Sequence, residues 1–282
     1  MMPTRRDLKF DHSKTDLKNW HARGPLIGHY MNALSIFFPE GERFFIHSLR
    51  LYRDQITDPE LKKAVTAFIG QEAMHGREHE EYNELLAAQG LPAAELGEVV
   101  NTILAQLTKL PKAMQLSITI ALEHFTAIYG DHLLRHPELT EGSDPEMVAM
   151  WNWHALEETE HKGVAYDVYT KVMGKTLSSY ALRTSTLIGV TALFLGLIAA
   201  FHVRIAMADK AAKKGVREWA GYAWFLFGPV GGLRKIALPW LDYFKPGFHP
   251  WDHDNREFLS RIDEIVARHA VPASKPTLAS AA

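Results

Sequence analysis

The chain has 282 residues, 47% hydrophobic and 23% charged, which is typical of a globular protein with one large domain or one domain and an appendage. Its formal net charge of −2 gives no broad attraction to polyanions, so no nucleic-acid partner is predicted. The absence of cysteine excludes disulfides, thiolate zinc sites, iron–sulfur clusters and cysteine nucleophiles.

Hydrophobic residues recur with helical spacing, and no useful length alternates with the period of a β-strand. Asp58 is a cap residue before a helix, Pro111 interrupts one, and Pro145 stands just inside the start of another. Gly174 can end that last helix, and Pro39 is expected to kink the first one. Helices are predicted, in chain order, over residues 26–56, 59–88, 93–110, 112–134 and 145–173.

The composition changes after residue 175, where long apolar runs replace the mixed helices. The predicted fold class is all-α, with a four-helix bundle and a C-terminal apolar helical appendage. Four segments are predicted: an irregular N-terminal segment (1–24), a metal-binding bundle (25–175), an apolar helical appendage (176–269) and a disordered tail (270–282).

A pattern of the form Glu … Glu-x-x-His occurs twice within the predicted bundle. It comprises Glu42, Glu72, His75, Glu123, Glu158 and His161. Residues three apart on a helix face the same way, so each Glu-x-x-His pair can reach one metal ion. Four carboxylates and two imidazoles suit two iron ions, an iron–manganese pair or two manganese ions. These six residues are therefore the predicted metal ligands and catalytic residues.

The residues around the pattern favour a metal site over the alternative that these residues lie on an ordinary exposed helix surface. A single Glu-x-x-His is common on exposed helices, but Glu42 and Glu123 stand in apolar runs, where an unpaired carboxylate is costly. His79 and His154 each lie four residues from a member of the pattern, on the same helix face. Each is either a third histidine ligand or, as favoured here, a hydrogen-bonding group behind a ligand. His124 and Glu157 adjoin pattern glutamates and are further candidates for these roles.

The chain resembles the ferritin-like di-iron carboxylate superfamily and, more closely, a bacterial family catalogued as predicted metal-dependent hydrolases. The resemblance covers roughly residues 20–255. It is carried by FPEGERFF (38–45), QEAMH (71–75), ALEH (121–124), WHALEETEHK (153–162) and PGFHPWD (246–252). It implies a ferritin-like bundle whose metal pair activates O₂.

The leading hypothesis is a di-iron or iron–manganese oxidase or oxygenase acting on an apolar organic substrate. A hydrolase that activates water between two metals is the first alternative. A non-enzymatic iron- or manganese-binding protein is the second. The expected partners are O₂, an apolar small molecule or lipid, an electron-donor protein, a membrane surface and a second copy of the chain.

The appendage raises the question of a membrane. Residues 187–201 carry no charge, and the stretch 184–203 is close to the length that crosses a bilayer. The positive-inside rule would then place the metal domain outside the cell, which the lack of a signal-peptide pattern disfavours. We therefore expect helices that enter one leaflet or cover the bundle, with spanning as the alternative. The predicted location is cytoplasmic, at the inner face of the membrane.

Overall fold

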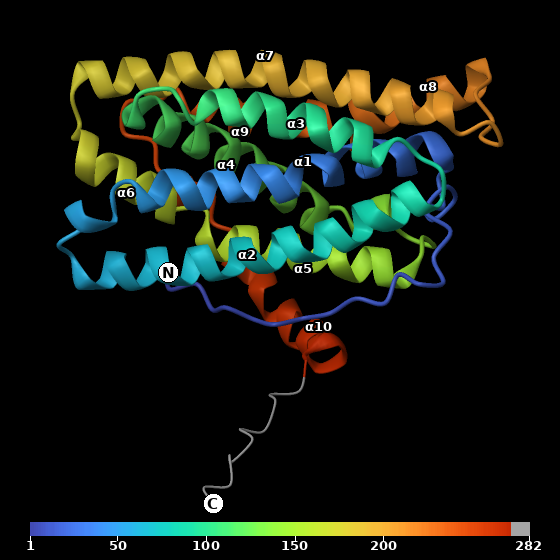
Figure 1. Cartoon of the computed structure of the whole chain (residues 1–282), viewed down its shortest axis with the longest axis horizontal. Coiled ribbons are helices and arrows are strands. Elements are labelled where there is room, and N and C mark those ends of the chain that lie inside the picture. The colour runs from blue at the N-terminus through green and yellow to red at the C-terminus, as the bar shows by residue number, and fades with distance from the viewer. Residues whose placement is uncertain (272–282) are drawn as a thin grey trace, which may run out of the picture.

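The computed structural model describes residues 1–271, and within them the secondary structure is helical except for one isolated β-bridge, so the all-α prediction is confirmed (Figure 1). The helices are α1 (Pro25–Arg50), α2 (Pro59–Ala88), α3 (Ala93–Leu107), α4 (Lys112–Arg135), α5 (Pro145–His161), α6 (Val164–Met173), α7 (Leu177–Ala208), α8 (Val216–Phe227), α9 (Gly232–Asp242) and α10 (Ile262–His269).

Two helix starts follow directly from their capping residues. Asp58 Oδ1 accepts hydrogen bonds from the backbone N–H groups of Glu60 at 2.9 Å and Leu61 at 3.4 Å. Asp144 Oδ1 caps α5 in the same way, at 3.0 and 3.1 Å. In both helices a proline follows the cap, where its missing N–H costs nothing. The predicted beginnings of α2 and α5 are confirmed.

The first helix is shorter than predicted. It ends at Arg50, and a 3₁₀ turn over Arg53–Gln55 leads to an extended backbone at Ile56. Tyr52 and Ile56 are buried in a core shared with α2, so the break turns both side chains inward. Burying them outweighs the few helical hydrogen bonds that continuation would add.

The helix predicted over 145–173 is also wrong as a single element, because it breaks between α5 and α6. Lys162 Nζ donates to the carbonyl of His253 at 2.5 Å and to Asn255 Oδ1 at 2.6 Å. The same ammonium lies 4.3 Å from the centre of the Trp251 ring. The C-terminal segment therefore packs into the break, where Gly163 leaves room for it.

Two glycine substitutions test this packing. Gly163→Ala is expected to destabilise the fold by about 1–3 kcal/mol, because its Cβ would lie 2.8 Å from Trp251 Nε1. Gly97→Ala in α3 meets nothing within 4 Å and is expected to add about 0.5–1 kcal/mol through helix propensity. Urea unfolding measures both, and a stabilising Gly163→Ala would contradict the packing of Trp251 into the break.

The arrangement of the helices places the six residues of the repeated pattern, which lie on α1, α2, α4 and α5, in the interior. Helix α1 packs on α2, and α4 packs on α5. Helix α7 lies along α1 and α4 at one edge of the molecule, with α8 continuing that edge (Figure 1). Among the described residues, α7 is the one helix long and apolar enough to cross a membrane.

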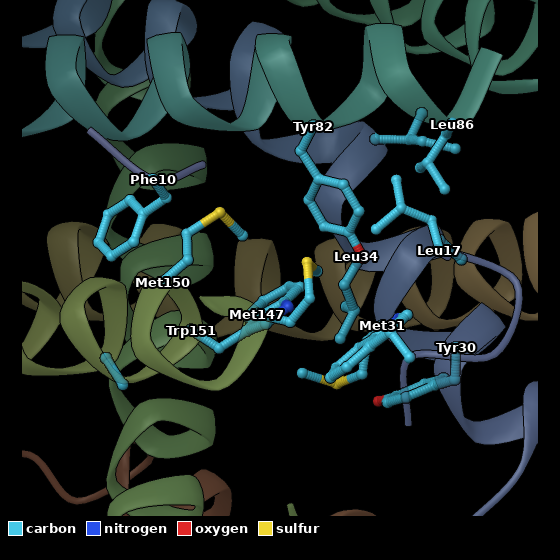
Figure 2. Close-up of a cluster of buried hydrophobic side chains, with 14 of the residues drawn as sticks. Phe10, Leu17, Tyr30, Met31, Leu34, Tyr82, Leu86, Met147, Met150 and Trp151 are labelled. Carbon is cyan, nitrogen blue, oxygen red and sulfur yellow. The ribbon is translucent and has the colours of Figure 1, made fainter. Parts of the chain in front are cut away.

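The N-terminal segment lacks helices but is firmly packed. Figure 2 shows Phe10 and Leu17 of this segment beside Tyr82 of α2 and Met150 of α5 in a hydrophobic cluster. At the other end of the chain, Val271 N–H donates to the carbonyl of Asp7 at 2.9 Å. The predicted disordered tail therefore begins too early, and its remaining residues, 272–282, lie outside the described part of the chain.

Candidate metal centre

The six residues of the repeated pattern meet in the interior, between four helices. They are Glu42 from α1, Glu72 and His75 from α2, Glu123 from α4, and Glu158 and His161 from α5. All are at most 2% exposed to solvent. Residues up to 119 positions apart in the sequence (161 − 42) are thus brought together in the interior.

One end of the cluster is centred on His161. Its Nε2 atom lies 3.0 Å from a Glu72 oxygen, 3.7 Å from a Glu123 oxygen and 3.5 Å from a Glu158 oxygen. Glu72, His161 and Glu123 each offer an atom within 4.8 Å of the others, a spacing that could hold a metal ion. Glu72 therefore approaches the histidine of the other half-pattern, which sequence spacing did not indicate.

The other end contains Glu42, His75 and His154, which also offer atoms within 4.8 Å of one another. His154 Nε2 lies 3.1 Å from Glu158 Oε1 and 3.9 Å from Glu42 Oε1. A third group of Glu72, His75 and Glu158 joins the two ends. The cluster thus has two separate ligand sets, and the group of Glu72, His75 and Glu158 connects them.

Several oxygens and nitrogens at this centre lack a hydrogen-bond partner among the described residues. Eight buried atoms make no hydrogen bond: both carboxylate oxygens of Glu42, Glu72 and Glu123, with His75 Nδ1 and His161 Nε2, whose 3.0 Å approach to Glu72 lacks hydrogen-bond geometry. Each unsatisfied buried polar group costs about 1–3 kcal/mol. Two cations would supply the missing partners and neutralise the carboxylates, so the donor set fits two divalent metal ions.

The electrostatics agree with this fit. Burial, followed by repulsion from Glu72 and Glu158, raises the pKa of Glu123 well above its ordinary value. Burial and the neighbouring His154 lower the pKa of His75 well below its ordinary value, which favours the neutral imidazole that metal ligation requires. Burial lowers the pKa of His161, but Glu158 and Glu72 outweigh it and raise the pKa overall. The concentration of negative charge there is what a cation would neutralise.

Each histidine of the pattern is oriented by a residue on the other helix of the pair α2 and α5. That residue stands directly before the other helix's own Glu-x-x-His. His75 Nε2 lies 3.1 Å from Glu157 Oε2, and His161 Nδ1 lies 3.0 Å from Gln71 Oε1. Since both partner oxygens accept hydrogen bonds, these ring nitrogens donate, which turns the bare nitrogen of each ring toward the cluster. Gln71 in turn donates from Nε2 to Glu160 Oε2 at 2.8 Å.

Arg6 of the N-terminal segment binds both Glu157, which orients His75, and Glu160, which holds Gln71. It donates to Glu157 Oε1 at 3.1 Å, to Glu160 Oε2 at 2.9 Å and to Glu160 Oε1 at 2.7 Å. Burial raises the pKa of Glu157 to about 7, although Arg6 acts to lower it. Sequence reasoning missed Arg6 and Gln71. Gln71 could have been found from its place, because it directly precedes Glu72 just as Glu157 directly precedes Glu158. Nothing in the sequence indicated Arg6.

The remaining candidate histidines occupy different places. His79 lies behind His154, with Nε2 2.8 Å from His154 Nδ1 and Nδ1 2.9 Å from Ser35 Oγ. His79 thus has the supporting geometry that the sequence favoured, whereas His154 itself faces the carboxylates. His124 points away, with Nε2 3.2 Å from the carbonyl of Pro239, so its proposed role near the cluster is wrong.

Two apolar cavities of about 90 Å³ each reach the cluster from different sides. The first, here the α5 cavity, is lined by Trp151, Tyr129 and other apolar groups and touches His154 and Glu158. The second, here the α7 cavity, lies between α3 and α7 and touches Glu42. The two share the residues Leu34, Phe38, Thr126 and Phe194. An apolar molecule could therefore lie against the cluster with room on both sides.

Comparison with known protein families gives a match over most of the chain. The family described as "Predicted metal-dependent hydrolase" matches residues 4–254, which includes all six pattern residues and Arg6. No curated protein and no solved structure matches the chain.

Proposed function

The chain belongs to the family described as predicted metal-dependent hydrolases, and from this premise we propose that its buried cluster is a dinuclear metal centre in a ferritin-like four-helix bundle formed by α1, α2, α4 and α5. The eight unpartnered atoms carry this proposal, because metal ions are the partners that such a donor set requires. Iron and manganese suit the mixture of carboxylates and imidazoles.

The ligands would divide between two ions. Glu42, His75 and His154 would hold one ion, and Glu123 and His161 the other. Glu72 and Glu158, which lie between the two groups, would complete the ligand set. His154 thus makes one ion richer in nitrogen than its neighbour.

For the reaction, we favour oxidation of an apolar substrate by O₂, with electrons from a donor protein in the cytoplasm. A pair of redox-active ions supplies O₂ reduction when bound. The protein's own part is to exclude water and to hold a hydrocarbon against the cluster, since Leu34, Phe38 and Phe194 line both cavities. Thr126, which donates to Glu158, fixes that carboxylate at the cavity wall.

Hydrolysis is the second candidate, favoured by the family description and by two hydroxyl groups. Tyr30 and Tyr129 lie 3.0 Å apart in the wall of the α5 cavity. Burial raises the pKa of both above the ordinary value of a tyrosine, so they remain protonated. Such donors could hold a substrate carbonyl near a water activated by two metals.

Loading the metal-free protein with ferrous iron under anaerobic conditions, and then adding O₂, tests both candidates. We expect two iron ions per chain and rapid O₂ consumption. His161→Ala should lose at least one ion and the O₂ consumption, while His47→Ala, an exposed histidine of α1, should change neither.

Zinc-loaded protein separates the reactions, because zinc has no redox chemistry. Turnover of ester substrates with zinc and without O₂ would establish hydrolysis and overturn the oxidase proposal. Failure of the protein to bind two ions would overturn both.

A further inference from the structure

The surface of α7, α8 and α9 is unusually apolar. Of the fifteen large hydrophobic side chains that are exposed among the described residues, ten lie on these three helices. They are Leu177, Ile188, Leu193, Val203, Met207, Val216, Trp224, Phe227, Leu238 and Leu241. Exposed apolar patches of this kind mark interaction sites in soluble proteins.

The same region carries positive charge. Residues 177–245 contain nine lysines and arginines against three acidic residues, a net charge of +6. The whole chain carries −2, so all other residues together carry −8. Asp209, which lies 3.0 Å from His29, and Arg183 are both buried, so eight basic residues and two acidic ones remain and the net charge of the others is still +6. The apolar surface is therefore also the cationic one.

The long helix lies flat on the body of the protein. Leu187, Ile198 and Phe201 on its inner face are buried. Arg183 near its start donates to the carbonyl of Tyr243 at 2.6 Å, and His202 near its end lies 2.8 Å from the carbonyl of Leu26. Since α7 is attached to the body at both ends, it presents its outer face along its length, as Figure 1 shows.

From these observations we propose that α7, α8 and α9 dock onto an anionic phospholipid bilayer. The apolar side chains enter one leaflet, and Lys210, Lys213 and Arg217 meet the headgroups. Helices that lie in the interface with apolar and basic groups bind such membranes through both effects. This docking does not rest on the proposed metal chemistry.

The docking surface also leads to the cluster. The α7 cavity is lined by Val190, Leu193 and Leu197 of α7, and it reaches Glu42. Leu193 is 46% exposed on the docking surface. If the proposed function holds, an apolar chain from the leaflet enters here.

Flotation of the full chain with vesicles tests the docking. Wild-type protein is expected to float with phosphatidylcholine vesicles that contain about 30% phosphatidylglycerol, and less with phosphatidylcholine alone or at high salt. The double variant Trp224→Ser/Phe227→Ser should weaken binding at least about tenfold, because two exposed aromatic side chains no longer insert. Lys210→Glu/Lys213→Glu should weaken it about tenfold on anionic vesicles.

Matched variants elsewhere on the surface serve as controls. Val271→Ser and Lys63→Glu change exposed side chains outside α7–α9 and should leave flotation unchanged. Absence of wild-type flotation would overturn docking, as would a dimer in sedimentation that dissociates in the Trp224→Ser/Phe227→Ser variant without any vesicle binding. Resistance to carbonate extraction would also overturn it, because that result indicates a spanning helix. The docking readout needs no metal, so it is independent of the oxygen test.

Discussion

Glu123→Gln is expected to stabilise the metal-free protein and to reduce the stabilisation that metal provides. Both carboxylate oxygens of Glu123 are buried without hydrogen-bond partners, and nearby carboxylates add repulsion. The neutral amide removes that repulsion, which should raise the free energy of unfolding by about 1–3 kcal/mol. With metal, the wild type should gain about 4 kcal/mol when the ion is at roughly 1,000 times its Kd.

Differential scanning calorimetry with a chelator and then with manganous ion measures both effects. Each kcal/mol should shift Tm by about 2–4 °C for a chain of this size class. We expect the variant to melt above the wild type in chelator and below it with manganese. Glu84→Gln replaces an exposed carboxylate of α2 and should change neither Tm. A variant that melts below the wild type in chelator would contradict the conclusion that the buried carboxylates lack partners and repel one another.

Arg6→Ala is expected to destabilise the protein by about 3–5 kcal/mol, which corresponds to a fall in Tm of roughly 10 °C. The reason is that Glu157 and Glu160, whose side chains are 0% and 5% exposed, would lose their cation. Glu157 and, through Gln71, Glu160 hold the two pattern histidines in place. Metal affinity should therefore fall about 10- to 100-fold, the usual effect of losing such support.

Arg5→Ala is the matched control, because Arg5 is the exposed neighbour in the same segment and forms no salt bridge with a described residue. It should leave metal affinity unchanged. Arg6→Lys should recover part of the stability and less of the affinity, since an ammonium cannot make the two-branched contact. Manganese titration well below Tm separates the two effects. Unchanged affinity in folded Arg6→Ala would show that Arg6 only stabilises the fold.

Much of the site could be predicted because helix geometry fixes the relation of residues three apart. Glu72 and His75 share a helix face wherever the helix packs, and an apolar run around Glu123 indicates that this carboxylate is buried. The helix starts at Asp58 and Asp144 were predictable for the same local reason, since a cap acts on the next few N–H groups.

The break after His161 was not predictable in this way. The sequence between Pro145 and Met173 supports a continuous helix, and only the contact of Lys162 with Asn255 and Trp251 shows why the chain departs from one. The energy that decides the break comes from residues about 90 positions away. Local propensity does not contain that information.

The sequence by itself determined an all-helical chain, the six-residue pattern and an apolar, cationic region after residue 175. Tertiary structure alone decided that His154 faces the carboxylates, that His124 does not, and that Arg6 supports both halves. It also decided that α7 lies along the body. The physical reason is that sequence spacing fixes direction within one helix, whereas contacts between helices depend on how each is rotated and packed against the others.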